Sequence, residues 1–254
     1  MIFAGIDAGS RAIKLVLIDE QSKILTSDVM DQGVKQAALA SKLLKQAVRR
    51  IGAEPENITS LIATGYGRDA LEFAAGTVTE ITCHAQGVIN QIPEARTIID
   101  IGGQDSKLIR LDASGRVHDF VMNDRCAAGT GRFLEVVSRQ LEMNIHDLGK
   151  YSQNADKPAV ISSMCVVFAE TEILGLLASG ESQENVVAGV QISIASRIAS
   201  MAGRQITEPV IFTGGVAMIP GMAQVLENII GHPITVAENP QMTGAMGAAI
   251  LAAQ

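Results

Sequence analysis

The amino-acid sequence predicts an α/β protein made of two related halves, on three observations. A pattern that begins at Ile6 returns at Ile99, and every matching residue lies 93 positions further along the chain. Segments with the pattern of strands alternate with segments that have the periodicity of helices through most of the 254 residues. Apolar residues make up 47% of the chain and 24 residues are glycine, which is typical of folded proteins. The length suffices for one large domain or two of modest size.

Each copy of the repeat predicts a hairpin with an aspartate just before its turn. Six of the fourteen aligned residues are identical, namely Ile, Asp, Gly, Lys, Leu and the final Asp. The copies contain Ile6-Asp7-Ala8-Gly9-Ser10, Lys14-Leu15 and Asp19, and Ile99-Asp100-Ile101-Gly102-Gly103, Lys107-Leu108 and Asp112. A strand, a tight glycine turn and a second strand fit both copies. The constant offset favours duplication of a half-domain over coincidence.

Helices and strands are predicted in alternation over the remainder of the chain. Residues Gln36–Arg50 carry their apolar side chains on one face and predict an amphipathic helix. Further helices are predicted at 132–143, 166–177, 185–203, 220–230 and 244–253. Strands are predicted at 58–64, 97–100, 106–111, 210–213 and 234–236. This alternation indicates a largely covered sheet in each half.

Charge and composition exclude several classes of function. A net charge of −7, an isoelectric point near 5.1 and the absence of Trp argue against a nucleic-acid partner. The best membrane candidate, 188–203, is short and contains Arg197, so no membrane association is predicted. The N-terminal residues lack the pattern of an export signal, which predicts a cytoplasmic protein. Its three cysteines are then expected to stay reduced unless they bind metal.

The two predicted turns have the residue types that phosphate binding needs. Glycine-rich turns allow backbone N–H groups to approach phosphate oxygens, each aspartate can hold hydrated Mg²⁺, and each lysine supplies positive charge. Gln104 and Asp105 in the second turn are candidates to orient or deprotonate a water for in-line attack. The candidate nucleotide-binding residues are Asp7, Gly9, Ser10, Lys14, Asp100, Gly102, Gly103, Gly214 and Gly215.

Ordinary hairpin turns are the competing interpretation, because Asp and Gly are common turn residues. One copy alone would favour that interpretation. Two copies at one offset, together with Gly214-Gly215 after a predicted strand, favour phosphate binding instead. The sequence contains no P-loop and no G-x-G-x-x-G after a strand, so neither of those nucleotide folds is supported.

Four motifs, in this order, resemble the superfamily of acetate and sugar kinases, Hsp70 and actin. They look like its phosphate-1, phosphate-2, adenosine and second connector motifs, and are Asp7-x-Gly9-Ser10, Asp100-x-Gly102-Gly103, Thr213-Gly214-Gly215 and Thr243-Gly244-Ala245-x-Gly247-Ala248-Ala249. The resemblance implies two duplicated actin-like (ribonuclease H-like) α/β domains with ATP in a cleft between them. The expected domains are residues 1–95 with 243–254, and residues 96–242.

Cys126 and Cys165 each precede a predicted helix. A helix N-terminus favours a thiolate or an anionic cluster, and Ser162 or Ser163 can cap the second of these helices. The two cysteines lie 39 positions apart and form no C-x-x-C pair, so spacing alone favours small buried side chains. Two thiolates per chain fall short of a Cys₄ set, which two chains related by a two-fold axis would complete.

Longer blocks resemble the activators of 2-hydroxyacyl-CoA dehydratases, a family that includes the ATPase subunits of benzoyl-CoA reductase. The blocks are Thr64-Gly65-Tyr66-Gly67-Arg68, Cys83-His84-Ala85, Asp100-Ile101-Gly102-Gly103-Gln104-Asp105, Met122-Asn123-Asp124-Arg125-Cys126-Ala127-Ala128-Gly129-Thr130-Gly131-Arg132-Phe133 and Cys165-Val166-Val167-Phe168-Ala169-Glu170. The resemblance covers essentially the whole chain. It implies that Cys126 and Cys165 of both protomers bind one [4Fe–4S] cluster at the interface of a homodimer.

The same resemblance implies an ATPase coupled to electron transfer. A ferredoxin or flavodoxin reduces the cluster, and ATP hydrolysis changes the angle between the cluster-bearing helices and drives one electron to the dehydratase or a related reductase. This chain departs from the family at Arg11, Ala12 and Ile13, where small hydroxyl residues are common, so the phosphate contacts of the first turn stay open. Cys83 matches the family pattern and is expected to have a structural role.

Two other functions remain compatible with the sequence. One is a small-molecule kinase of the same superfamily that uses Asp105 as the base toward a hydroxyl group. The other is a binding module that senses nucleotide or redox state without catalysis. A brown preparation under anaerobic conditions distinguishes the activator from the kinase, which would be colourless.

Overall fold

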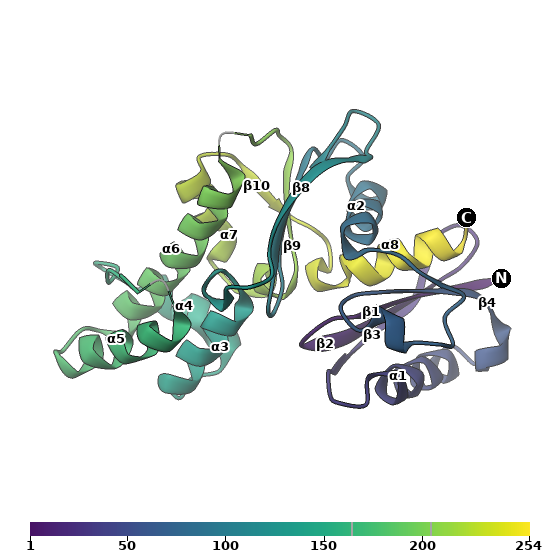
Figure 1. The fold of residues 1–254 in the computed structure, drawn as a ribbon, viewed down its shortest axis with the longest axis horizontal. Coiled ribbons are helices and arrows are strands. Elements are labelled where there is room, and N and C mark those ends of the chain that lie inside the picture. The colour runs from purple at the N-terminus through teal and green to yellow at the C-terminus, as the bar shows by residue number, and fades with distance from the viewer. Residues whose placement is uncertain (164, 204) are drawn as a thin grey trace. The chain divides into compact units, whose positions relative to one another are not determined.

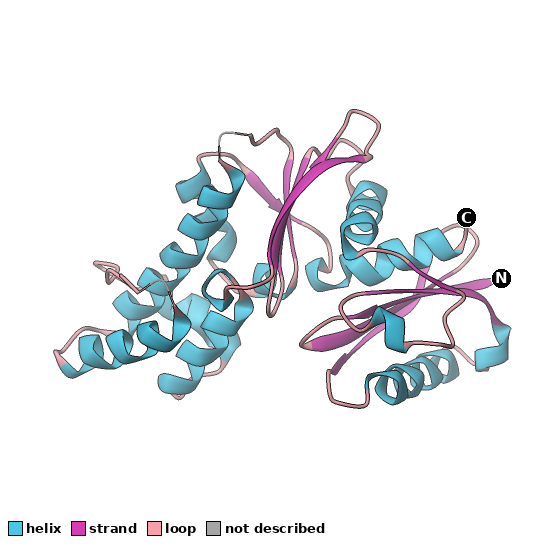
Figure 2. Cartoon of the chain, in the orientation of Figure 1, coloured by secondary structure: helices cyan, strands magenta, loops and turns pink. Residues whose placement is uncertain are grey.

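The computed structural model of the chain describes residues 1–163, 165–203 and 205–254. These residues form two compact units, and helices and strands alternate within each (Figures 1 and 2). Unit 1 consists of Met1–Ala95, Leu111–His118 and Ala237–Gln254, and unit 2 consists of Arg96–Arg110 and Asp119–Val236. The C-terminal segment therefore returns to the unit in which the chain begins.

Unit 1 is a five-stranded mixed sheet with helices on both faces. The strand order is β3-β2-β1-β4-β5, in which β1 pairs antiparallel with β2 and parallel with β4. Helix α1 (Gln36–Arg50) lies on one face, and α8 (Thr243–Ala252) on the other with α2 (Glu80–Gln91) over it (Figure 1). The strands are β1 (Ile2–Ala8), β2 (Ala12–Ile18), β3 (Ile24–Asp31), β4 (Ile58–Thr64) and β5 (Gly76–Thr77).

Alternating side chains of β1 and β2 enter two different cores, as the period of two in a strand requires. One set packs against α1 and the other packs against α8. The α1 side contains Ala4, Ile6, Leu15 and Leu17, and the α8 side contains Phe3, Val16 and Ile18. Burial of these apolar surfaces is the main force that holds the three layers together.

Helices α2 and α8 approach so closely that their backbones touch at glycine positions. A Cβ atom at Gly87 would collide with the carbonyl of Thr243, and a Cβ at Gly247 would collide with the carbonyl of Cys83. Small residues on facing helices allow this approach, which large side chains would prevent. The contact fixes the start of α8 against the middle of α2.

Unit 2 repeats the sheet of unit 1 strand for strand. Its order is β10-β9-β6-β7-β8, in which β6 pairs antiparallel with β7 and parallel with β9. The strands are β6 (Thr97–Ile101), β7 (Ser106–Leu111), β8 (Val117–Asn123), β9 (Val210–Thr213) and β10 (Ile234–Val236). Since β6 corresponds to β1 and β9 to β4, the structure confirms the duplication that the repeat predicts.

Helices of unit 2 pack on this sheet around one large core. The helices are α3 (Gly131–Gln140), α4 (Leu148–Ser152), α5 (Val166–Ala178), α6 (Gln183–Ala202) and α7 (Met222–Ile230). Phe133 of α3 and Phe212 of β9 are among the largest side chains that this core buries completely. The central helix α6 is capped by Ser182, whose hydroxyl accepts the N–H of Asn185.

Most predicted elements are confirmed, with small shifts at their ends. Helix α7 begins at Met222 rather than 220, because Gly221 adopts a left-handed conformation as its N-cap. Helix α3 ends at Gln140 rather than 143. Helices and strands that the sequence pattern did not predict are α2, α4, β3, β5 and β8.

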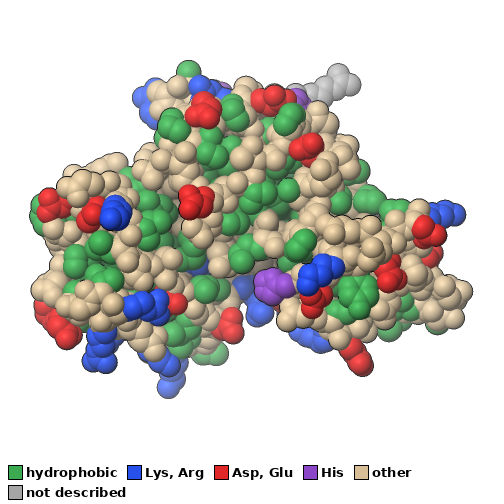
Figure 3. Space-filling model, turned by 180° about the vertical axis from the view of Figure 1, so that it is seen from behind, with side chains coloured by type: hydrophobic (Ala, Val, Ile, Leu, Met, Phe, Trp, Pro, Cys, Tyr) green, Lys and Arg blue, Asp and Glu red, His purple; other side chains and the backbone are tan. Residues whose placement is uncertain are grey.

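No helix within the described residues is both long and apolar enough to cross a membrane. On the face of the molecule shown in Figure 3, acidic and basic side chains are interspersed, with apolar side chains between them.

Candidate functional site

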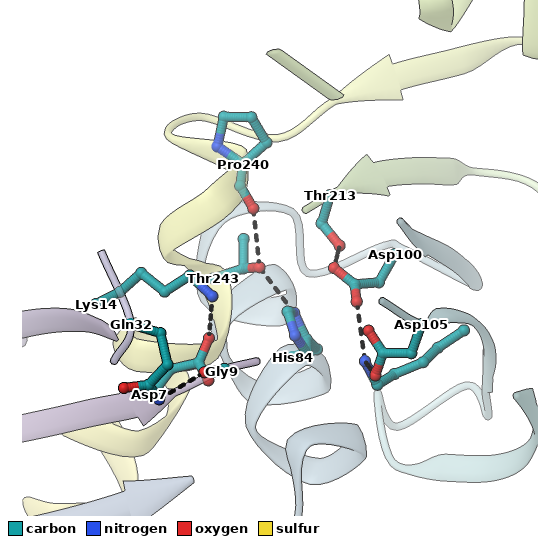
Figure 4. Close-up of polar contacts among 11 residues, drawn as sticks. Asp7, Gly9, Lys14, Gln32, His84, Asp100, Asp105, Thr213, Pro240 and Thr243 are labelled. Carbon is teal, nitrogen blue, oxygen red and sulfur yellow. Dashed lines mark hydrogen bonds and ion pairs between the residues drawn. The ribbon is translucent and has the colours of Figure 1, made fainter. Parts of the chain in front are cut away.

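The first predicted turn lies between β1 and β2 and holds an ion pair. Asp7 and Lys14 are cross-strand partners in the register, and Lys14 Nζ lies 2.9 Å from Asp7 Oδ2 (Figure 4). The turn is fastened by Gln32, whose Nε2 donates to the carbonyl of Gly9 at 2.8 Å. A Cβ at Gly9 would lie 2.8 Å from Lys14 Nζ, so a larger residue here would have to displace the end of the Lys14 side chain. Ser10 follows, partly exposed, at the tip of the turn.

One oxygen of Asp7 is buried without a hydrogen-bond partner among the described residues. Asp7 is only 5% exposed, and its Oδ1 has no such partner, nor does the nearby hydroxyl of Thr64 at the end of the neighbouring strand β4. Gly65 follows with φ of 91°, and a Cβ there would lie 2.5 Å from Asp7 Oδ1. A buried carboxylate oxygen with no partner is costly, and its presence indicates a place for a ligand, water or cation.

The second predicted turn, between β6 and β7, holds a closed network of charges. Lys107 is 2% exposed, and its Nζ lies 3.3 Å from Asp100 Oδ2 and 2.6 Å from Asp105 Oδ2 (Figure 4). Thr213, at the end of β9, donates its hydroxyl to Asp100 Oδ1 at 3.0 Å. Both oxygens of Asp100 therefore have partners, which is how a buried carboxylate is normally stabilised.

The glycines of the second turn bring its backbone close to Asp105. The N–H of Gly102 donates to the carbonyl of Asp105 at 2.9 Å, and a Cβ at Gly102 would lie 2.6 Å from Asp105 Oδ1. Asp105 is partly exposed and Gln104 is exposed, so both are accessible to solvent. The turn thus combines accessible backbone with a carboxylate that Lys107 holds in place.

The pair Gly214-Gly215 leaves β9 at the position equivalent to Gly65. Gly214 has φ of 89°, and a Cβ there would collide with the carbonyl of Ile101 on β6. Gly215 is exposed and begins a short 3₁₀ turn, Gly215–Met218. This arrangement presents bare backbone at the end of the strand.

His84 is a buried polar residue for which the composition and the spacing of the sequence predicted no role. Its Nδ1 lies 2.9 Å from Thr243 Oγ1, and Thr243 Oγ1 donates to the carbonyl of Pro240 at 3.2 Å (Figure 4). Because the hydroxyl proton points to Pro240, His84 donates through Nδ1. His84 thereby fixes the first residue of α8. Cys83 beside it is fully buried, and burial raises the pKa of its thiol to about 12, so it stays protonated.

Cys126 lies in a turn that Asn123 holds from both sides. The N–H of Cys126 donates to Asn123 Oδ1 at 3.0 Å, and Asn123 Nδ2 donates to the carbonyl of Cys126 at 2.8 Å. The predicted helix after Cys126 is α3, which begins at Gly131, one residue before the predicted start at Arg132. Cys126 precedes a single 3₁₀ turn, Ala127–Gly129, and α3 begins only after Thr130, which caps it.

The start of α3 is also bonded to the second glycine turn. The N–H of Gly131 donates to the carbonyl of Gly102, and the N–H of Arg132 donates to the carbonyl of Gly103, both at 2.9 Å. These bonds satisfy N–H groups that a helix N-terminus otherwise leaves unpaired.

Cys165 is exposed and is the N-cap residue of α5. The prediction that Ser162 or Ser163 caps this helix is wrong, since no side chain caps it. Both serines are bonded instead to Glu172, further along α5. Among the described residues, no group of three or more His, Cys, Asp or Glu side chains has the arrangement of a metal site.

Comparison with known proteins places these residues in a wider context. The model of the BadF/BadG/BcrA/BcrD ATPase family matches residues 4–252. An activator of lactoyl-CoA dehydratase from Anaerotignum propionicum is 42% identical over 253 residues, which cover 99% of this chain and 97% of that protein.

Two solved structures are similar over the whole chain. The activator of 2-hydroxyisocaproyl-CoA dehydratase from Clostridium difficile, with bound ADPNP, has a TM-score of 0.95 and 40% identity, and the match covers 100% of this chain and 94% of that one. The (R)-2-hydroxyglutaryl-CoA dehydratase component A of Acidaminococcus fermentans has a TM-score of 0.94 and 36% identity, with coverage of 100% and 98%. These similarities confirm the predicted actin-like α/β fold class.

Proposed function

Because the chain belongs to the BadF/BadG/BcrA/BcrD ATPase family, we propose that it is the ATPase that delivers single electrons to a 2-hydroxyacyl-CoA dehydratase. The family match confirms the resemblance found in the sequence, and the chain is an ATPase of that family. One observation carries the electron-transfer part of the proposal. Cys126 and Cys165 are accessible and lie at the starts of helical segments, whereas Cys83 is sealed in the core.

The residues of both turns bind Mg²⁺ and the phosphates of ATP. Gly9, Ser10 and Gly103 offer backbone N–H groups, Gly102 closes the second turn through its bond to Asp105, and Gly214-Gly215 offers backbone to the nucleoside. The unpaired Oδ1 of Asp7 supports a role in holding hydrated Mg²⁺, which prefers carboxylate and water oxygens. Lys14 and Lys107 neutralise charge in the turns, and Asp100 anchors the second turn.

Asp105, with Gln104 beside it, orients the water that attacks the terminal phosphate. Its carboxylate is partly exposed, so it can reach a water, while the contact of its Oδ2 with Lys107 fixes its direction. The aligned position in the first turn is Ala12, which cannot perform this task. The attacking water is therefore oriented from the second turn alone.

Cys126 and Cys165 of two protomers provide the four thiolates of one [4Fe–4S] cluster. A cluster held in this way supplies one-electron transfer. The dipole of α5 stabilises a thiolate at Cys165, and reciprocal bonds from Asn123 hold the backbone of Cys126.

A homodimer would also cover apolar surface next to Cys165. Val167 and Phe168, in the first turn of α5, are 67% and 69% exposed in the single chain. Exposed aromatic and aliphatic side chains beside a predicted ligand are typical of a protein interface. The partner is a 2-hydroxyacyl-CoA dehydratase or related reductase, and ferredoxin or flavodoxin is the electron donor.

The test is purification under anaerobic conditions of the wild type, Cys126→Ala, Cys165→Ala and the control Cys83→Ala. We expect iron and sulfide, a brown colour and dimeric mass for the wild type and for Cys83→Ala. The other two variants should lose the cluster and still bind ATP. Normal iron and sulfide in Cys126→Ala or Cys165→Ala would contradict the ligand assignment. A colourless wild type that phosphorylates a small hydroxyl compound would favour the kinase, and a cluster without ATP turnover would favour the sensor.

A further inference from the structure

The segment 157–163, which leads into the Cys165 region, is fastened to α6 at its start. The N–H of Lys157 donates to Asn185 Oδ1 at 3.1 Å, and the N–H of Ala159 donates to the carbonyl of Asn185 at 2.8 Å. A Cβ at Gly189, one turn further along α6, would collide with the carbonyl of Ala159. The segment therefore lies directly against the backbone of α6, and we call it the tether.

The end of the tether is fastened to α5 by one side chain, Glu172. Glu172 Oε1 accepts the N–H of Ser162 at 2.8 Å and its hydroxyl at 2.6 Å, and Oε2 accepts the N–H of Ser163 at 2.9 Å. Glu172 lies seven residues after Cys165, on the helix that Cys165 begins. The end of the tether is thus hydrogen-bonded to α5, the helix that begins at the predicted ligand Cys165.

The protonation state of Glu172 suits this role. Partial burial raises the pKa of its carboxyl group, but the hydrogen bonds from Ser162 and Ser163 outweigh burial and lower the pKa to about 2. Glu172 is therefore ionised at neutral pH, and its bonds to the tether are of the stronger, charge-assisted kind.

These bonds also explain why neither serine caps α5. The Ser162 hydroxyl and both serine N–H groups are directed at Glu172, and no side chain occupies the N-cap position of α5 other than that of Cys165 itself. The positive end of the helix dipole is then left to the Cys165 thiolate.

We propose that Glu172 is a positioning residue for Cys165. By accepting hydrogen bonds from the end of the tether, Glu172 holds the tether against α5 and so fixes the backbone of Cys165 for metal binding. This inference rests on the proposed function, in which Cys165 is a cluster ligand. Cys126 has a corresponding device in Asn123, which binds both the N–H and the carbonyl of that cysteine. Partners that orient a ligand in this way commonly change metal affinity when they are removed.

The test compares Glu172→Ala and Glu172→Gln with the wild type as anaerobic, cluster-loaded protein. Gln keeps one acceptor oxygen but places an NH₂ group against a donor, so its effect should be intermediate. We expect iron transfer to a chelator to be about 10- to 100-fold faster in Glu172→Ala. Amide exchange at Ser162 and Ser163 should accelerate in both variants. The matched control is Glu170→Gln, which removes a charge from the same helix without touching the tether and should behave as the wild type does.

Two further measurements separate positioning from general stability. ATP turnover without dehydratase should be unchanged, while the EPR spectrum of the reduced cluster should alter. Wild-type rates of iron release in Glu172→Ala, from a wild type that does hold iron, would overturn this proposal alone. A wild type that binds no iron at all would overturn the proposed function and this inference together. If Glu172→Ala fails to fold, the same comparison is decided by Glu172→Gln.

Discussion

The two halves of the molecule use one backbone pattern and treat its central aspartate in opposite ways. In both, an Asp precedes the turn of a hairpin, a Lys faces it across the hairpin, and a Thr-Gly pair ends the parallel neighbouring strand. In unit 2, Thr213 donates to Asp100 and Lys107 bridges Asp100 to Asp105. In unit 1, neither Asp7 Oδ1 nor Thr64 Oγ1 has a hydrogen-bond partner among the described residues.

The duplicated halves therefore share a backbone arrangement but differ in the hydrogen bonding of their equivalent side chains. The turn of unit 2 is internally satisfied and therefore stiff before any ligand arrives. The turn of unit 1 leaves polar atoms for a ligand, at a cost to the stability of the empty protein. Four predictions follow, each of which contrasts equivalent residues of the two halves.

The largest effect is expected for Asp105, which has no counterpart because Ala12 occupies the aligned position. Asp105→Ala should lower ATP turnover by about 10²- to 10⁴-fold, the usual range for loss of a group that assists proton transfer. Nucleotide affinity should change much less. Steady-state ATPase assays and equilibrium titration with a nucleotide measure the two quantities. ATP turnover equal to that of the wild type would remove Asp105 from the mechanism.

Replacing the two lysines should distinguish a closed network from an open one. Lys107→Met keeps the aliphatic volume but leaves Asp100 and Asp105 without their cation, which should lower the free energy of unfolding by about 3–5 kcal/mol. Lys14→Met should cost less, because the Lys14 side chain is 19% exposed whereas that of Lys107 is 2% exposed. Urea denaturation of nucleotide-free protein measures both. Equal losses would show that the two turns are equally satisfied.

The equivalent threonines give a smaller and cleaner contrast, since Val has nearly the same shape. Thr213→Val leaves Asp100 Oδ1 without its donor and should destabilise the protein by about 1–3 kcal/mol. Thr64→Val removes a buried hydroxyl that makes no hydrogen bond with the described residues, so it should be neutral or slightly stabilising. The same denaturation experiment applies. A large loss in Thr64→Val would mean that Thr64 is bonded after all.

The smallest effect concerns the second turns of the repeat, where Asp19 and Asp112 correspond. Asp19 accepts two backbone N–H groups, whereas Asp112 accepts the hydroxyl of Ser114 and the side chain of Arg116 in addition to two N–H groups. Hydrogen bonding, first from the Ser114 hydroxyl and then from the Arg116 backbone, holds the pKa of Asp112 below its usual 3.8.

A depressed folded-state pKa gives stability that is present above pH 3.8 and disappears as the pH falls through the lower folded value. The wild type should therefore exceed Asp112→Asn slightly in thermal midpoint near pH 6, and the difference should shrink as the solution is acidified below pH 3.8. Asp19→Asn is the control and should show a smaller difference. A difference in thermal midpoint that grows as the pH falls would show that the folded-state pKa of Asp112 is not depressed.

The fold was largely predictable because the repeat carries it. Asp7 and Asp100, with the lysines seven residues later, marked both hairpins, and the strand order then followed the same pattern twice. Helix α2 escaped prediction because it packs on α8 through Gly87 and other small residues, which leave no broad apolar stripe. The edge strands β3 and β8 have exposed, mixed side chains and gave no clear alternation.

The positions of the candidate site residues in the two hairpins were predictable, but their hydrogen bonding was not. Sequence spacing placed Asp7, Lys14, Asp100 and Lys107 in the two hairpins, yet which carboxylate is satisfied depends on the geometry at the ends of β4 and β9. The Thr-Gly pairs after the two apolar strands were the signal that would have revealed Thr64 as the counterpart of Thr213. The role of Glu172 could not be foreseen, because serines before a helix ordinarily predict a cap.

The two backbone bonds between α3 and the glycine turn of unit 2 have a mechanical consequence. Only four residues lie between Cys126 and Gly131, whose N–H is bonded to the carbonyl of Gly102. When that turn shifts, either two strong hydrogen bonds break or the front end of α3 travels with it, and the latter is by far the easier path. A movement of the glycine turn is thus transmitted to Cys126 through residues 127–130 alone, without passing through side chains of the core.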